Sequence, residues 1–327
     1  MDYLSIIKHP ILGDLDDFSK LFNDAFSHSN GLLASVLSYI KKRTGKQMRP
    51  ILIFLLAKNF GKVSDVTLRS AVGLELLHTA SLVHDDVVDD SEERRGQKSV
   101  NAEYNNKLAV LVGDYILSTA LLNISLTANH LIVQNLSELG CTLAKGEILQ
   151  LSNISNSDIS EDVYYQVIEQ KTAALFESCC AIATLSTNAS DEQIEKAKKF
   201  GKELGIIFQI KDDIFDYFDS EEIGKPTGND MLEGKLTLPA IYALRSTNNQ
   251  EMYNIALKVK QHNVTSDEIK RLVDFTKSNG GIEYAERVMA KLHESCNTYI
   301  SENIIDNDIQ HALYNYVEFI IQRNRLI

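Results

Sequence analysis

Proline is scarce in this 327-residue sequence, which contains only Pro10, Pro50, Pro226 and Pro239. No proline occurs from residue 51 to residue 225. Because a proline inside a helix costs about 3 kcal/mol, so long a gap favours long helices. Strand-like alternation of apolar and polar residues between Asn-Gly or Asp-Gly turns is also missing. The two absences predict an all-α protein.

Cysteine is rare as well, and its spacing matches neither a metal site nor a disulfide scaffold. We expect small buried thiols at Cys141, Cys179, Cys180 and Cys296. Long apolar runs are missing, since the longest, "ILIFLLA", is far shorter than the about 20 residues that span a bilayer. The first residues lack a basic segment followed by an apolar core, so no signal peptide is expected. The sequence therefore predicts a cytoplasmic protein without stable membrane insertion.

Positive charge is in deficit. The chain has 33 Lys and Arg residues against 45 Asp and Glu residues, which gives a formal net charge of −12. This balance argues against a general nucleic-acid binder, because such proteins present a basic surface. An anionic ligand must therefore be held by local basic residues or by a metal ion.

Helical periodicity is the main feature that is present. Apolar residues recur at three- and four-residue spacings over about 20 positions in four segments, 68–90, 109–128, 167–186 and 192–218. Several of these segments are apolar nearly all round, which is typical of the interior of a large bundle. Polar residues around Ser160 and Ser190 mark helix starts. We predict a single all-α domain over residues 1–327.

An apolar helix runs directly into four aspartates in "LVHDDVVDD". Asp85 and Asp89 are four residues apart, so on a helix their Cβ atoms lie about 5–6 Å from each other. Asp86 and Asp90 repeat this spacing. Like charges so placed cost stability unless a cation lies between them. His84, beside them, is expected to pack or to form hydrogen bonds rather than to bind a metal.

A second acidic segment, "FQIKDDIFDYFD", ends another apolar helix and contains Asp212, Asp213, Asp216 and Asp219. Carboxylates at a helix C-terminus face the negative end of the macrodipole, which disfavours each by a few tenths to about 1 kcal/mol. Departures from such local rules tend to mark functional sites. A solvated helix end explains either motif alone equally well, but it explains both together poorly. Asp90 and Asp219 individually fit a solvated position better than a ligand position.

The chemistry of these side chains indicates which metal they would bind. Oxygen ligands without a nearby cluster of Cys or His indicate a hard cation. One or two carboxylates per ion, with the remaining positions open to water and phosphate, is typical of Mg²⁺. A calcium loop of the EF-hand type does not occur in the sequence. The two motifs therefore predict several Mg²⁺ ions that bind a polyphosphate group.

Basic residues gather beside both acidic motifs. They come in pairs in "GKQMRP", "ERRGQK" and "GKPTGNDMLEGKLTLP": Lys46 and Arg49, Arg94 and Arg95, and Lys225 and Lys235. Any one of them alone is better explained as a solvated charge, but their common placement favours phosphate binding. Arginine suits bidentate phosphate recognition and lysine offers a point charge. The pattern predicts two phosphate sites, one bridged by metal and one held by protein cations alone.

Six separated motifs resemble those of the trans-isoprenyl diphosphate synthases, in the same order: "GKQMRP", "HTASLVHDDVVDD" followed by "RRG", "LVGDY", "KT", "FQIKDDIFD" and "GKLTLP". The resemblance covers roughly residues 40–240 and is closest to the medium- and long-chain type, such as octaprenyl diphosphate synthases. It implies an all-α bundle with a central apolar cavity and a homodimer. It also implies a Mg²⁺-dependent condensation of isopentenyl diphosphate with an allylic diphosphate, in which the departing diphosphate accepts the proton that is lost.

The resemblance implies roles for individual residues. Asp85 and Asp89 resemble the ligands of two Mg²⁺ ions and Asp212 that of a third, with Asp216 in support. The expected binders of the allylic diphosphate are Arg94, Lys171, Thr172, Gln209, Lys225 and Lys235. Those of isopentenyl diphosphate are Lys46, Arg49, His78 and Arg95. The residues expected to act most directly in catalysis are Asp85, Asp89, Arg94, Lys171, Asp212 and Lys225.

Other functions remain open at this point. A terpene cyclase or a head-to-head condensing enzyme would share the helices and aspartates, but it would not need "GKQMRP" and Arg95 for a second diphosphate. A non-catalytic subunit of a heteromeric synthase would not need two complete aspartate motifs. A farnesyl or geranylgeranyl diphosphate synthase would differ only in product length.

The resemblance implies that product length is set in part by Ala80 and Ser81, the fifth and fourth residues before Asp85. In the family that the sequence resembles, bulky aromatic residues here close the pocket early, whereas these two side chains are small. Since a helix advances about 1.5 Å per residue, the first obstruction lies deeper, with Leu77 as a candidate. We expect a product of about C40. Close helix packing is the alternative explanation for two small residues at these positions.

Overall fold

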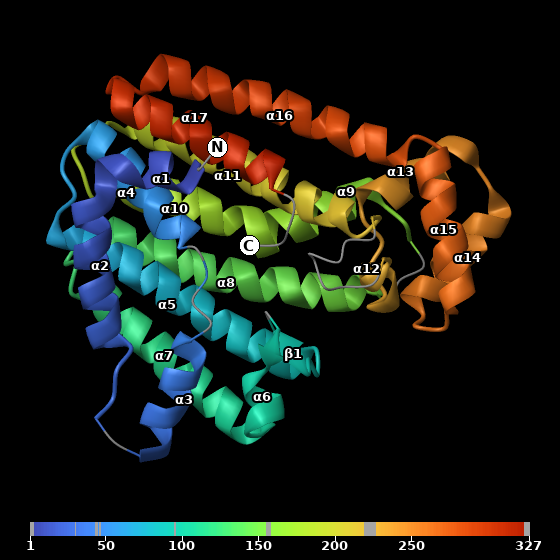
Figure 1. Cartoon of the computed structure of the whole chain (residues 1–327), viewed down its shortest axis with the longest axis horizontal. Coiled ribbons are helices and arrows are strands. Elements are labelled where there is room, and N and C mark those ends of the chain that lie inside the picture. The colour runs from blue at the N-terminus through green and yellow to red at the C-terminus, as the bar shows by residue number, and fades with distance from the viewer. Residues whose placement is uncertain are drawn as a thin grey trace. The chain divides into compact units, whose positions relative to one another are not determined.

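The protein is almost entirely helical within the residues that its structure, a computed structural model, describes: 3–29, 31–42, 45, 47–94, 96–154, 158–218 and 227–323. The only strands in these ranges are β1 (Glu93–Arg94) and β2 (Gln97–Lys98), which pair antiparallel (Figure 1). The predicted all-α fold is confirmed.

The chain divides into two compact units. Unit 1 consists of Met1–Gly140, Ser178–Lys198 and Ile304–Leu313, and unit 2 consists of Cys141–Glu177, Lys199–Asn303 and Tyr314–Ile327. The single domain over residues 1–327 stays a prediction. Four of the five unit boundaries fall within helices, namely α8 (His130–Ile154), α10 (Ala174–Leu185), α11 (Asp191–Phe215) and α17 (Asn307–Gln322), and the fifth follows residue 303.

The remaining helices each belong to one unit. Unit 1 contains α1 (Tyr3–Lys8), the 3₁₀ turn η1 (His9–Ile11), α2 (Leu12–Ala25), α3 (Gly31–Lys41), α4 (Met48–Phe60), α5 (Asp65–Val88), α6 (Val100–Glu103) and α7 (Asn106–Ser125). Unit 2 contains α9 (Glu161–Ile168), the π-helical turn η2 (Glu169–Ala173), α12 (Asn229–Leu232), α13 (Leu238–Thr247), α14 (Gln250–Lys260), α15 (Ser266–Ser278) and α16 (Gly281–Asn303).

The longest apolar run of the sequence forms most of α4. Every side chain from Ile51 to Ala57 is 0% exposed. A helix that is apolar on all sides must be surrounded by other elements, so this run lies in the core of unit 1.

The cysteines only partly match the expectation of buried thiols. Cys179, Cys180 and Cys296 are buried, and burial raises the pKa of the Cys179 and Cys296 thiols well above their usual range. Cys141 is exposed, so the prediction is wrong for this residue. The reason is its place on α8, where its side chain faces solvent rather than the core.

Helix α5 carries the first acidic motif, and local signals fix both of its ends. Ser64 is the N-cap: its hydroxyl accepts a hydrogen bond from Thr67 N–H, and the Thr67 hydroxyl accepts one from Ser64 N–H. At the other end Asp89 is the C-cap, and Asp90 has a φ of 48°. The left-handed backbone at Asp90 prevents the helix from continuing past the acidic motif. This conformation costs local strain, because it is unfavourable for a residue with a Cβ atom.

Helices α5 and α7 lie side by side in unit 1 (Figure 1). A β-carbon added at Gly73 would lie 2.4 Å from Ile124 Cγ1, and one at Gly113 would lie 2.3 Å from His84 Nε2. Two glycines therefore permit the close approach. His84 Nε2 also lies 3.3 Å from Asp114 Oδ1, so His84 packs and pairs as expected.

By length and composition, α7 is the one helix in the described part of the chain that is long and apolar enough to cross a bilayer. Only 39% of its most apolar segment is buried. A single helix of this kind is weak evidence for a membrane span.

Candidate active site

The first acidic motif ends α5 and continues into the β1–β2 hairpin. Asp86 is 2% exposed, whereas Asp85 is partly exposed and Asp89 is exposed. Arg94 on β1 donates a hydrogen bond from Nε to Asp86 Oδ1 at 2.6 Å. The buried Asp86 carboxylate therefore orients Arg94 through a charge-assisted hydrogen bond, and Asp85 and Asp89 lie nearer the surface.

Arg49 and His78, which the resemblance assigns to one diphosphate, lie together in unit 1. Arg49 Nη2 is 2.6 Å from His78 Nε2, and Arg49 Nη1 is 3.3 Å from Glu75 Oε1. Sequence reasoning misses Glu75, although a lone acidic residue three positions before His78 in an apolar helix was an available signal. The mostly buried Glu75 carboxylate helps to hold the guanidinium in one orientation.

Lys171 and Thr172 lie on η2, a π-helical turn between α9 and α10. Such turns occur frequently at functional sites. A β-carbon added at Gly146 would lie 2.9 Å from Lys171 Cγ, and one at Gly205 would lie 2.5 Å from Ala173 Cα. The two glycines let α8 and α11 approach the turn closely, and this contact fixes its position.

We expect Gly205→Ala to lower the free energy of unfolding by about 1–3 kcal/mol, because the added methyl group meets backbone that cannot yield easily. Gly140→Ala is the matched control, since a β-carbon there would lie 3.9 Å from Leu77 Cδ1. That variant should gain roughly 0.5–1 kcal/mol from the lower backbone entropy of alanine. Urea unfolding followed by circular dichroism measures both, and equal stability of the two variants would contradict the close contact at η2.

A chain of hydrogen bonds connects η2 to the second acidic motif. Thr172 Oγ1 donates to Gln209 Oε1 at 2.7 Å, and Gln209 Nε2 donates to Asp213 Oδ1 at 2.8 Å. Tyr164 donates from its hydroxyl to Asp213 Oδ2 at 2.6 Å. Burial first, and then the charge of Asp230, raises the pKa of Asp213 to about 8. The network brings Thr172 and Gln209 together, as the resemblance implies, and adds Tyr164, which sequence reasoning misses.

Asp216 connects the end of α11 to the short helix α12. Its Oδ1 and Oδ2 accept hydrogen bonds from the backbone N–H groups of Asn229 at 2.9 Å and Asp230 at 3.2 Å. Lys235 follows α12, with its backbone N–H donating to Asp230 O at 2.8 Å and its ammonium donating to Glu233 Oε2 at 2.7 Å. Asp216 therefore has a structural part in addition to any part in ligand binding.

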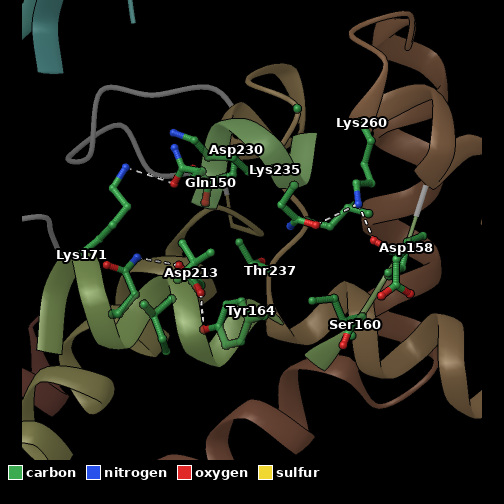
Figure 2. A pocket seen from close by; sticks show the side chains of 18 of the residues that line it. Gln150, Asp158, Ser160, Tyr164, Lys171, Asp213, Asp230, Lys235, Thr237 and Lys260 are labelled. Carbon is green, nitrogen blue, oxygen red and sulfur yellow. Dashed lines mark hydrogen bonds between the residues drawn. The ribbon is translucent and has the colours of Figure 1, made fainter. Parts of the chain in front are cut away.

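A cavity of about 260 Å³ in unit 2 brings several predicted residues together (Figure 2). Lys171, Thr172, Gln209 and Lys235 line it, with Asp213 and Tyr164. Lys171 donates to Gln150 Oε1 at 3.1 Å and pairs with Glu147. Lys260 lies at the upper right of Figure 2, where its ammonium donates to Asn153 and to the Asp158 carbonyl. Besides carboxylates and apolar side chains, the cavity is thus lined by ammonium, hydroxyl and amide groups, which can donate hydrogen bonds to a phosphorylated ligand.

The acidic side chains fit an open Mg²⁺ site rather than a closed metal centre. Within the described residues, no group of three or more His, Cys, Asp and Glu side chains could hold an ion by itself. Mg²⁺ commonly binds through one or two carboxylates and takes its other ligands from water and phosphate. Asp85 with Asp89, and Asp212 with Asp216, offer that number.

The remaining predicted residues divide into two groups. Lys46, Arg95 and Lys225 lie outside the described residues. The residues expected to set product length lie on α5, where Ala80 is 1% and Leu77 is 4% exposed. The Ser81 hydroxyl donates to His78 O at 2.8 Å.

Comparison with known proteins shows a match to one family model over most of the chain. The model described as polyprenyl synthetase matches residues 30–276. Among curated proteins, all-trans-nonaprenyl-diphosphate synthase (geranyl-diphosphate specific) of Rhodobacter capsulatus is 34% identical over 289 residues, which cover 88% of this chain and 88% of that protein.

The chain is also similar to solved structures of prenyl diphosphate synthases. The crystal structure of geranylgeranyl pyrophosphate synthase from Bacteroides thetaiotaomicron is similar with a TM-score of 0.87 and 49% identity, covering 99% of this chain and 100% of that one. Polyprenyl synthase from Caulobacter crescentus CB15, complexed with calcium and isoprenyl diphosphate, is similar with a TM-score of 0.88 and 26% identity over 98% of each chain. The family match spans both acidic motifs and all three basic pairs.

Proposed function

The chain belongs to the polyprenyl synthetase family and is a trans-prenyltransferase, and from this premise we propose that it builds an all-trans polyprenyl diphosphate by repeated condensation of isopentenyl diphosphate with an allylic diphosphate. The family match over residues 30–276 carries the proposal, because it includes both acidic motifs together with the basic residues beside them. A protein that only binds diphosphates would not need both carboxylate pairs.

We assign Mg²⁺ to the two acidic motifs, two ions to Asp85 and Asp89 and a third to Asp212 with Asp216. The bound ions would withdraw charge from the allylic diphosphate and so favour cleavage of its C–O bond. The similar Caulobacter crescentus protein holds calcium and isoprenyl diphosphate. That a similar protein binds both a hard divalent cation and a diphosphate supports a hard-cation site here.

The allylic diphosphate is assigned to Arg94, Lys171, Thr172, Gln209 and Lys235, and to Lys225 outside the described residues. Lys171 and Lys235 are both paired with glutamates, Glu147 and Glu233. A glutamate therefore orients each ammonium group before the substrate binds. An ammonium group has three N–H donors, so it can also donate a hydrogen bond to a diphosphate. Thr172 and Gln209 act as a hydrogen-bonded pair.

Isopentenyl diphosphate is assigned to Arg49 and His78, with Lys46 and Arg95 outside the described residues. Contact with Glu75 directs the Arg49 guanidinium. In the condensation, the double bond of isopentenyl diphosphate attacks the allylic carbon, a new C–C bond forms, diphosphate leaves and one proton is lost. We assign acceptance of that proton to the departing diphosphate.

We expect Arg49→Ala mainly to raise the KM for isopentenyl diphosphate and Lys235→Ala mainly to raise the KM for the allylic substrate, because each truncation removes contacts to one ligand. Arg95→Ala and Lys225→Ala should follow the same division. Arg69→Ala is a control for loss of an arginine ion pair on unit 1, since Arg69 pairs with Asp65 at 2.7 Å. Steady-state kinetics with each substrate varied measures the split, and indistinguishable defects in all four variants would refute it.

We propose a medium-to-long product of about C40. The side chains of Ala80 and Ser81 are too small to block the growing chain, so the first obstruction would lie further along the helix. The nonaprenyl-forming relative supports a long product. A geranylgeranyl-length product is the second candidate, because the Bacteroides thetaiotaomicron protein, named for that product, is 49% identical to this chain.

We propose a homodimer as the assembly. Large apolar side chains on α7 that are at least two-fifths exposed support a partner surface: Val110, Leu111, Leu121 and Leu122. An apolar row of this kind on one helix is typical of a surface that another chain covers.

The proposed activity requires isopentenyl diphosphate, an allylic primer and Mg²⁺ together, and this requirement can be tested directly. Labelled isopentenyl diphosphate should enter a solvent-extractable product only when an allylic primer and Mg²⁺ are both present. Incorporation that needs an added second protein would instead support a non-catalytic or incomplete subunit.

A further inference from the structure

Arg323, which follows the end of α17, is buried in unit 2 beside the second acidic motif. It is 5% exposed, and its Nη2 lies 2.7 Å from Asp212 Oδ1. Arginine is rarely buried to this degree unless its charge is paired, so the contact with Asp212 explains its position. Arg323 lies outside the residues 30–276 that match the family model, and no motif in the sequence singles it out.

The guanidinium is held from several directions. Its Nη2 donates to Phe208 O at 2.7 Å and its Nε donates to Ile320 O at 3.1 Å. It lies 4.0 Å from the ring centroid of Phe208 and 5.5 Å from that of Phe215. Phe208 and Phe215 occupy α11 about one turn before and one turn after Asp212, so Arg323 is fitted to the part of the helix that presents this carboxylate.

The contact with Arg323 involves one oxygen of the Asp212 carboxylate. Asp212 Oδ1 is buried, whereas the Asp212 side chain as a whole is 21% exposed. Solvent therefore reaches the side chain away from the oxygen that faces Arg323. An arginine held by backbone carbonyls and an aromatic ring is a rigid partner, and it restricts rotation of the carboxylate.

We propose that Arg323 is a positioning residue for the metal site: by fixing Asp212 Oδ1 it sets the orientation in which the carboxylate meets a divalent cation. This inference rests on the proposed function, which assigns the third Mg²⁺ to Asp212. It extends the site to a residue after α17. Partners behind a metal ligand commonly set its orientation and so its affinity.

The test measures Mn²⁺ binding by electron paramagnetic resonance in the presence of inorganic diphosphate. Mn²⁺ is used because it prefers the same oxygen ligands as Mg²⁺. Arg323→Met should weaken binding of the ion at Asp212 by about 10-fold or more, in line with other residues that support a ligand. Arg323→Lys should fall between this variant and the wild type, because lysine keeps the charge but lacks the planar fork. Ile320→Val is the control for lost packing, since Ile320 is fully buried on the last turn of α17, just before Arg323.

Three results would overturn the proposal. Wild-type Mn²⁺ affinity in folded Arg323→Met would show that the arginine only anchors the end of α17. Tighter binding would show that it competes with the cation. If Arg323→Met does not fold, the Mn²⁺ affinity of Arg323→Lys is the deciding measurement. Wild-type affinity in Arg323→Lys would also contradict the proposal. Asp212→Asn separates this inference from its premise: if that variant binds as many ions as the wild type, the assignment of metal to Asp212 is wrong.

Discussion

Asp85→Asn and Asp212→Asn are each expected to lower turnover by at least about a hundredfold with Mg²⁺ saturating, because each removes a charged ligand of the proposed Mg²⁺ ions. Asp85→Asn should leave stability unchanged or slightly higher, since the like-charge pair with Asp89 is relieved. Asp212→Asn removes the negative partner of the buried Arg323 and should therefore lower stability, although the amide oxygen can still accept a hydrogen bond from the guanidinium.

Single-turnover and steady-state assays at several Mg²⁺ concentrations measure the effect, with circular dichroism to confirm that the variants are folded. Asp90→Asn is the matched control, because Asp90 belongs to the same motif, is exposed, and lies beyond the end of α5. Its turnover should stay close to that of the wild type. Near wild-type turnover in Asp85→Asn or Asp212→Asn would refute the metal assignment for that motif.

Ala80→Phe is expected to shorten the product to about C15 or C20, because an aromatic ring overfills a position that holds only a methyl group. Ala80 is 1% exposed, so the larger side chain must displace its neighbours or occupy the space of the growing chain. A loss of stability of about 1–3 kcal/mol is expected as well, as for other overpacked positions. Reversed-phase chromatography of the dephosphorylated products measures chain length.

Ala80→Ser is the control, since it changes polarity with little change in volume, and its product should match that of the wild type. An unchanged product distribution in folded Ala80→Phe would contradict this explanation of chain length. So would a wild-type product that ends at C15.

Much of the fold follows from patterns that act over short distances. The apolar run at residues 51–57 is a buried helix, and Ser160 caps α9 by accepting a hydrogen bond from Val163 N–H. Ser190 and Gln193 form reciprocal hydrogen bonds where α11 begins. Both aspartate motifs end helices, as their sequences indicate. Propensity, capping and periodicity are local properties, so sequence alone is sufficient for these features.

Contacts between distant residues are what sequence reasoning misses. Nothing near Arg323 in the sequence indicates that it pairs with Asp212. Glu75 stands out as a lone acidic residue in an apolar helix, but the sequence does not indicate that Arg49 is its partner. The close approach of Gly146 and Gly205 to the π-helical turn η2 is another contact between distant residues. Such features are decided by tertiary packing, which local propensity does not encode.

The most direct test of the proposed function is the identity of the product made by the purified protein. The measurement is incubation with Mg²⁺, isopentenyl diphosphate and either geranyl or farnesyl diphosphate, followed by chromatography and mass spectrometry of the products. We expect linear all-trans polyprenyl diphosphates longer than the primer, with one inorganic diphosphate released for each isopentenyl unit added. A cyclic hydrocarbon made from the allylic substrate alone, or no elongated product with either primer, would contradict the proposed function.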